Sequence, residues 1–416
     1  MANKKLLKSA KIICPSSSFH NKTQDILIEN GKITKIEDEI SNFSDFEIVE
    51  YTDLHVSLGW MDMKANFREP GEEWKENLES GAKAAKFGGF TNVALSPATT
   101  QPIDSKNRVN YLVNNTKDLP VNITVLGTLS DQHQGKELSE MYEMSQAGAV
   151  AFTDDKNKIN ISLLSKGLLY TKTINKLIIS FANENSIANN GQINEGETST
   201  KMGLKAIPSL AEEIQITRDL SLAEYHNTKI HFSTISTAKS VELIRQAKAK
   251  GIKVTCDIAA HQLFFTDKNV AEFDSNFKVL PPFRTQNDIN ELIKGLKDGT
   301  IDAICSDHIP HDIESKKLEF DQAKFGIIGL ETMFGATNTI LKNELSLEKI
   351  IEKITVSPRE ILNIEIPKIE LNEKVELTLF SPTKNWIFTK NDIYSLSKNT
   401  PFIGTEFTGK SFGTIC

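Results

Sequence analysis

Between residues 55 and 310, short apolar runs rich in β-branched residues alternate with longer helical patterns. This alternation is typical of repeated strand–helix units, which place their strands in one parallel sheet. Eight candidate strands span residues 55–63, 90–96, 122–128, 149–154, 177–182, 229–233, 253–258 and 301–306. Eight such units predict an α/β fold, a closed (β/α)8 barrel of the TIM type.

Two helical patterns are clear enough to predict helices on the outside of this barrel. In 286–298, the apolar residues Ile289, Leu292, Ile293 and Leu296 fall at i, i+3, i+4 and i+7 on one face. The segment 236–250 begins with two hydroxyl residues suited to capping and is followed by Gly251, which is suited to ending a helix.

The two ends of the chain show a different sequence pattern from residues 55–310. Residues 5–40 and 366–416 contain short strand-like runs, with a turn at Asn30 and Gly31. We therefore expect a small β-domain made from residues 1–54 and 366–416, joined to a barrel over residues 55–365.

Composition excludes several classes of protein. The net charge is −7, from 48 basic and 55 acidic residues, without the long basic run that nucleic-acid binding favours. No apolar run approaches the roughly 18 residues of a membrane helix, and lysines interrupt any signal-peptide core near the start. The four cysteines lie far apart without CxxC spacing. We expect a cytoplasmic protein that binds neither nucleic acid nor membrane.

In a barrel of this type, the active site lies where the strands end, at their carboxyl termini. A series of motifs falls at these positions and in the turns between them. In order they are FREPG at 67–71, GGFT at 88–91, AFTDD at 151–155, HFST at 231–234, PPFR at 281–284, SDHIPH at 306–311 and GLET at 329–332. This series resembles the bacterial type I dihydroorotases of the amidohydrolase superfamily, and it covers nearly the whole chain.

The resemblance implies a hydrolase that interconverts dihydroorotate and carbamoyl aspartate with a zinc-activated hydroxide. A metal suits this chemistry because it lowers the pKa of bound water and polarises an unreactive amide carbonyl. The family's ligands are an HxH pair after strand one, an aspartate after strand four, one histidine after each of strands five and six, and an aspartate after strand eight.

Carried over position by position, much of this ligand set is missing. Lys64 and Asn66 replace the HxH pair, and Phe181 replaces the strand-five histidine, since no histidine occurs from 134 to 225. Three expected metal ligands remain as remnants, Asp154, His231 and Asp307, and Asp307 is also the catalytic aspartate that the resemblance implies. We expect no bound cofactor, because an ammonium at Lys64 repels a metal ion and can itself neutralise the carboxylates.

The residues that the resemblance assigns to the substrate pocket are also only partly present. The family's arginine and last histidine survive as Arg68 and His311, while its asparagines fall on Ala98 and Leu280. Both survivors also have a structural interpretation, Arg68 as an ion-pair partner of Glu69 or Asp307 and His311 as a hydrogen-bonded histidine. Asp307, without a metal, is better explained as the ion-pair partner of Lys64 than as a general base, and Lys64 is expected to reach Asp154, Asp307 or both.

Three functional hypotheses follow. The first is a non-catalytic dihydroorotase homologue, a scaffold or regulatory partner in pyrimidine biosynthesis, for which the resemblance suggests aspartate carbamoyltransferase as partner. The second is an active dihydroorotase or related cyclic amidohydrolase with a reduced zinc site of His231, Asp154 and Asp307. The third is a protein that binds another small anion through Arg68. A homodimer is expected in each case, since it is the most common soluble oligomer.

Overall fold

The computed structural model describes residues 4–41 and 46–416, and its centre is a nearly closed barrel of eight parallel strands. The barrel strands are β6 (Trp60–Ala65), β7 (Phe90–Leu95), β8 (Asn122–Gly127), β9 (Ala151–Phe152), β10 (Leu177–Phe181), β13 (Ile230–Ser233), β14 (Val254–Ala259) and β15 (Ala303–Cys305). They pair in chain order, and a parallel bridge from Ala65 to His308 links the first strand to the segment after the last. The predicted (β/α)8 barrel is confirmed.

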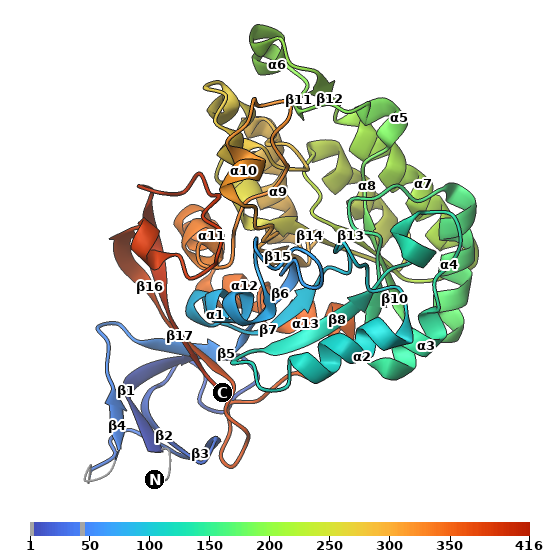
Figure 1. Ribbon diagram of the computed structural model, residues 1–416. Coiled ribbons are helices and arrows are strands. Elements are labelled where there is room, and N and C mark those ends of the chain that lie inside the picture. The colour runs from blue at the N-terminus through green and yellow to red at the C-terminus, as the bar shows by residue number, and fades with distance from the viewer. Residues whose placement is uncertain (1–3, 42–45) are drawn as a thin grey trace.

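Helices surround this barrel, as Figure 1 shows. They are α1 (Leu78–Gly88), α2 (Lys106–Asn115), α3 (Met141–Ala147), α4 (Ile161–Thr173), α5 (Asn185–Ala188), α6 (Glu197–Met202), α7 (Leu210–His226), α8 (Ala238–Ala249), α9 (Gln286–Asp298), α10 (Ile313–Lys316), α11 (Met333–Leu341), α12 (Leu347–Glu352) and α13 (Val356–Leu362). Short 3-10 turns are η1 (Asp131–His133), η2 (Ala260–Leu263), η3 (Asp267–Val270), η4 (Ser275–Phe277) and η5 (Lys390–Asp392). A minor strand pair is β11 (Ile193–Asn194) with β12 (Ala206–Ile207).

The two helices predicted from periodicity both form. Helix α9 has the predicted bounds, and Thr285 starts it with a capping box in which its hydroxyl accepts from the Asp288 amide. Helix α8 starts one residue after its cap, Thr237, whose hydroxyl accepts from the Ser240 amide. Ser236, the other hydroxyl at that end, donates instead to the buried carboxylate of Glu212.

Strands from both chain ends form a second sheet, as predicted. It contains β1 (Lys4–Ile13), β2 (Thr23–Glu29), β3 (Lys32–Glu37), β4 (Glu47–Val49), β5 (His55–Leu58), β16 (Leu377–Ile387) and β17 (Glu406–Ile415). The turn at Asn30 and Gly31 joins β2 to β3, and both residues have the positive φ that such a tight hairpin requires.

One expectation about the strands is wrong. The predicted first barrel strand, 55–63, is two strands, because β5 pairs with β1 and β16 in the terminal sheet and only β6 enters the barrel. Gly59 lies at the crossing, where a Cβ atom would come within 2.1 Å of the Thr91 hydroxyl oxygen. The chain can pass from one sheet to the other here because glycine has no side chain.

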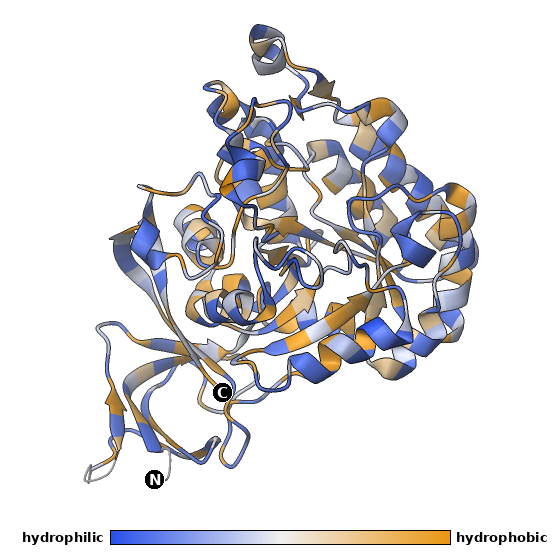
Figure 2. Cartoon of the chain, viewed as in Figure 1, coloured by the Kyte–Doolittle hydropathy of each residue, from blue (hydrophilic) through white to orange (hydrophobic). Residues whose placement is uncertain are grey.

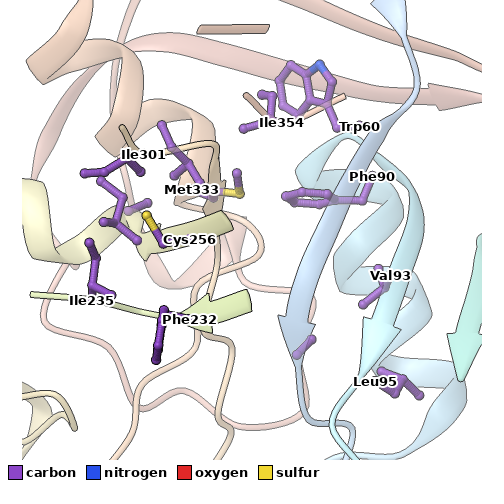
Figure 3. Packing of buried hydrophobic residues seen from close by; sticks show 14 of the residues in the cluster. Trp60, Phe90, Val93, Leu95, Phe232, Ile235, Cys256, Ile301, Met333 and Ile354 are labelled. Carbon is purple, nitrogen blue, oxygen red and sulfur yellow. The ribbon is translucent and has the colours of Figure 1, made fainter. Parts of the chain in front are cut away.

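The main core lies between the barrel strands and the surrounding helices. Hydrophobic residues are concentrated in the strands and on the inner faces of the helices in Figure 2. Trp60 and Phe90 lie on neighbouring strands (Figure 3), and their rings meet edge to face with centres 6.2 Å apart. The ring of Phe334 in α11 packs on Trp60 with centres 4.6 Å apart. This packing joins the amino-terminal ends of two barrel strands to α11, at the opposite end of the barrel from the candidate site. No helix in the described residues is long and apolar enough to cross a membrane.

Candidate functional site

Lys64, at the end of β6, lies at the mouth of the barrel where the strands end. It is buried, and its ammonium lies 3.1 Å from Oδ1 of Asp155 and 3.6 Å from Oδ1 of Asp307. The same ammonium is 4.7 Å from the centre of the Phe181 ring and 3.4 Å from the Thr234 hydroxyl. The lysine therefore lies among residues that end or follow four other strands of the barrel.

A second lysine, Lys156, completes this arrangement. Its ammonium lies 3.3 Å from Oδ2 of Asp307 and 5.7 Å from the centre of the Phe181 ring. Two ammonium groups thus face two carboxylates, Asp155 and Asp307, around one aromatic ring. Two charges of each sign balance, and the electron-rich face of the ring further favours the cations.

Electrostatics keep the ion pair of Lys64 and Asp155 charged despite burial. Burial alone lowers the pKa of Lys64, but Asp155 and Asp307 outweigh it and hold that pKa well above its ordinary value. Burial likewise raises the pKa of Asp155, but Lys64 and then Lys156 bring it down to about 2. Both groups are therefore ionised at neutral pH.

The structure confirms that Lys64 pairs with one of its two expected partners. Asp307 is a partner, as the sequence predicts, but the second partner is Asp155 and not Asp154. Asp154 accepts hydrogen bonds from the amides of Leu129 and Ser130, both at 2.9 Å, and from the Ser130 hydroxyl. These bonds hold Asp154 against the loop after β8. Its neighbour Asp155 is the aspartate that faces the barrel mouth.

His231 is also engaged away from Lys64. It is completely buried within β13, with Nδ1 2.8 Å from the Thr255 hydroxyl and Nε2 2.9 Å from Oδ2 of Asp257. Thr234, three residues later, is the residue after β13 that reaches the Lys64 ammonium. These two hydrogen bonds give His231 a structural role inside the barrel.

These residues do not fit a divalent metal ion. Asp154, His231 and Asp307 are not brought together, and in residues 4–41 and 46–416 no group of three or more His, Cys, Asp or Glu side chains could hold one. Asp307 Oδ1 and both ring nitrogens of buried His261 lack hydrogen-bond partners within these residues. Such atoms are potential ligands, but the ammonium groups of Lys64 and Lys156 lie against Asp307 and would repel a dication.

Arg68 and His311, the two residues predicted to bind substrate, lie next to each other. Arg68 donates from Nε to the Pro310 carbonyl at 2.9 Å, and its Nη2 lies 3.1 Å from Nε2 of His311. Burial, and then the adjacent Arg68 charge, lower the pKa of His311 to about 2, so this imidazole is neutral. The nearest carboxylate to the Arg68 guanidinium is that of Glu72, at 3.5 Å, and not Glu69 or Asp307 as the structural interpretation suggested.

Arg68 and His311 line a cavity of about 430 Å³ that also exposes Lys156. Asn66 lies in its wall and braces the loop, donating to the Ala98 carbonyl at 2.9 Å and accepting from the Arg68 amide at 2.8 Å. Three residues of the mouth, Asp155, Lys156 and Thr234, were not predicted as site residues from the sequence. A lysine directly after the paired aspartates was the one available signal for Lys156.

The barrel of eight parallel strands, with the sheet from both chain ends beside it, has the fold of solved hydantoinases. The L-hydantoinase (dihydropyrimidinase) from Arthrobacter aurescens superimposes with a TM-score of 0.85 at 22% identity, over 100% of this chain and 95% of that one. The dihydropyrimidinase from Brevibacillus agri superimposes with a TM-score of 0.83 at 18% identity, over 99% of this chain and 93% of that one. At these identities the likeness concerns the fold.

Sequence comparison identifies the family. A family model described as dihydro-orotase-like matches residues 55–240. The dihydroorotase of Carboxydothermus hydrogenoformans is 39% identical over 416 residues, 99% of this chain and 96% of that one. The dihydroorotase of Acetivibrio thermocellus is 38% identical over 414 residues, 99% of this chain and 97% of that one. This chain belongs to the dihydroorotase family.

Proposed function

We propose that this chain is a catalytically silent dihydroorotase homologue that serves as a scaffold or regulatory partner in pyrimidine biosynthesis. The observation that carries the proposal is the Lys64 ammonium beside Asp155 and Asp307, in a mouth where the described residues include no group of three or more potential metal ligands. Hydrolysis of a cyclic amide needs an activated water and a polarised carbonyl. Neither ammonium group can replace a metal hydroxide as the nucleophile, and both are held by carboxylates.

The alternative is an enzyme with a reduced zinc site made of His231, Asp154 and Asp307. It requires these three side chains to converge on one ion. The hydrogen bonds of His231 to Asp257 and of Asp154 to Leu129 and Ser130, together with the ion pairs of Asp307 with the two lysines, direct the three side chains to different partners. Zinc binding would therefore require all three sets of contacts to be given up.

We expect no dihydroorotase turnover from the purified full chain, with or without added zinc. The assay follows ring closure of carbamoyl aspartate and hydrolysis of dihydroorotate, and the Carboxydothermus hydrogenoformans relative is the positive control. Turnover that rises with added zinc would contradict the proposal and favour the reduced-site alternative.

We also expect a homodimer that binds aspartate carbamoyltransferase from the same organism. Light scattering after size exclusion should give twice the mass of 46.4 kDa at micromolar concentration. A mixture with the carbamoyltransferase should elute earlier than either protein alone. A monomeric mass would count against the dimer, and separate elution of the two proteins would count against the scaffold role.

A further inference from the structure

A row of uncharged side chains runs along the outer side of α7, from its first residue to its last turn. The members recur every three or four residues, which places them on one side of the helix: Leu210, Ile214, Thr217, Ser221 and Tyr225. All five are exposed, and Tyr225 is the most exposed of them, at 83%. We call this row the α7 stripe.

Helix α4 extends this uncharged surface. The two helices lie side by side at the edge of the molecule (Figure 1). Ile161, Ser165 and Leu169 recur every four residues along α4, and the Ser165 hydroxyl lies 2.7 Å from Nε2 of His226 at the end of α7. This row of α4 therefore borders α7. Ile161 and Leu169 are exposed on it, so that apolar side chains from both helices share one face.

Most polar groups of this face already have partners within the chain. The hydroxyls of Thr217 and Ser221 each donate to a carbonyl one turn earlier in their own helix, at 2.9 Å. Beside the stripe, Arg218 pairs with Glu184 at 3.2 Å and with Asp219 at 2.7 Å. Covering these groups costs little free energy, because hydrogen bonds that are made inside the chain are kept when water is removed.

The other charged side chains lie at the edges of the face. Lys172 of α4 donates to the His226 carbonyl at 2.8 Å, which holds its ammonium between the two helices. Glu213 and Glu224 lie about 220° and 200° of helical turn from His226, so both are on the side of α7 away from α4. Lys166 lies off the row that borders α7, about 100° beyond its middle member.

The helices α8 and α9, which follow α7 around the barrel, have a different outer surface. They carry ion pairs there, among them Arg245 with Glu242 and with Asp298, both at 2.8 Å, and Lys294 with Glu291. Charged pairs of this kind are typical of a helix face in contact with water. The uncharged, apolar face of α7 and α4 is instead typical of a surface that another protein covers.

We propose that a second copy of this chain covers this face, with α7 of each copy packed against α7 of the other. In a symmetric dimer the same patch is used twice, and residues at the two-fold axis meet their own copies. A charge there would face a like charge, whereas the α7 stripe has none and is complementary to itself. This inference rests on the homodimer proposed for the chain, to which it assigns a surface, and not on catalytic silence.

The sizes of the side chains also suit a helix that packs against its own copy. Thr217 and Ser221, near the middle of the stripe, are small and let two helix axes approach closely. Leu210 and Ile214 on one side of them, and Tyr225 on the other, supply the apolar contact area.

Ile214→Asp tests this surface, because it places an unpaired charge on the stripe of each copy. Sedimentation velocity at micromolar concentration should show the wild type as a dimer and Ile214→Asp as a monomer, with the dissociation constant raised at least about a hundredfold. Ser221→Arg, two turns further along the stripe, should act in the same way. Ile313→Asp is the matched control, at an apolar position of α10 that is 66% exposed outside this face, and should leave the dimer intact. Circular dichroism shows that each variant is folded.

Hydroxyl-radical footprinting locates the contact in the wild type. Tyr225 should be modified severalfold less in the wild-type dimer than in Ile214→Asp, while exposed Trp74, in the loop after β6, should be modified equally in both. A wild type that is monomeric would overturn the proposal. A dimer that persists in both Ile214→Asp and Ser221→Arg, with Tyr225 unprotected, would also overturn it, but would leave the homodimer standing on another face. Dihydroorotase turnover of the same samples tests catalytic silence separately.

Discussion

Replacing Lys64 with alanine is expected to lower the free energy of unfolding by roughly 1 to 4 kcal/mol. Its ammonium lies against Asp155 and Asp307, whose side chains are only 11% and 1% exposed. Without the lysine, the two negative charges are left with Lys156 alone, and the remaining repulsion must be relieved by protonation or rearrangement. Urea denaturation of the wild type and the variant at neutral pH measures the change.

A double-mutant cycle separates the charge effect from the loss of packing. Asp155→Asn should destabilise the wild type but should cost less in the Lys64→Ala background, since the uncompensated charge is then removed. Lys166→Ala, at an exposed position of α4, is the matched control and should change the stability by less than about 0.5 kcal/mol. Additive effects of Lys64→Ala and Asp155→Asn would show that the ion pair is not what stabilises the mouth.

Arg359→Leu is expected to cost about 3 kcal/mol, because it breaks a buried ion pair that joins the barrel to the terminal sheet. Arg359 of α13 donates to the carbonyls of Gly59 and Thr355, at 2.8 and 2.9 Å, and to Oε1 of Glu376 at 2.6 Å. Its removal leaves the Glu376 carboxylate and a carbonyl at the sheet crossing without this donor. The melting temperature and the urea midpoint of the variant measure the loss.

The control for this prediction is an arginine with two ion pairs at the surface. Arg245 pairs with Glu242 and Asp298 at 2.8 Å each, but a third of its side chain is exposed. Arg245→Leu should therefore cost less than about 1 kcal/mol, since solvent screens the charges in both the folded and unfolded states. Similar losses for the two arginine variants would mean that Arg359 does not hold the two sheets together.

The barrel could be predicted from the sequence because each buried strand forms a short apolar run between helical patterns. The crossing at Gly59 could not, since 55–63 reads as one run although its two halves belong to different sheets. Hydropathy indicates only which residues are buried, and both halves of this run are buried, so hydropathy does not separate them. The hydrogen-bond partners that divide them come from β1, β16 and β7, far away in the sequence.

The site was predicted less completely for a related reason. Motif positions located Lys64, Arg68, Asp307 and His311, because these follow or end strands of the barrel. Which of two adjacent aspartates faces the mouth depends on the backbone, and Asp155 has φ of +46°. This left-handed turn aims Asp155 at Lys64, whereas Asp154 binds the amides of the neighbouring loop. The reach of Lys156 to Asp307 depends likewise on the fold around it.

We propose that Lys64 and Lys156 occupy the position to which the sequence resemblance assigns a metal, and the metal content of the purified chain tests this proposal most directly. Elemental mass spectrometry on the full chain, expressed with zinc in the medium, should find much less than one zinc per chain. Exposure to a chelator should leave its melting temperature unchanged. Stoichiometric zinc that a chelator removes, with loss of stability, would contradict the claim and show that the barrel mouth rearranges to bind the ion.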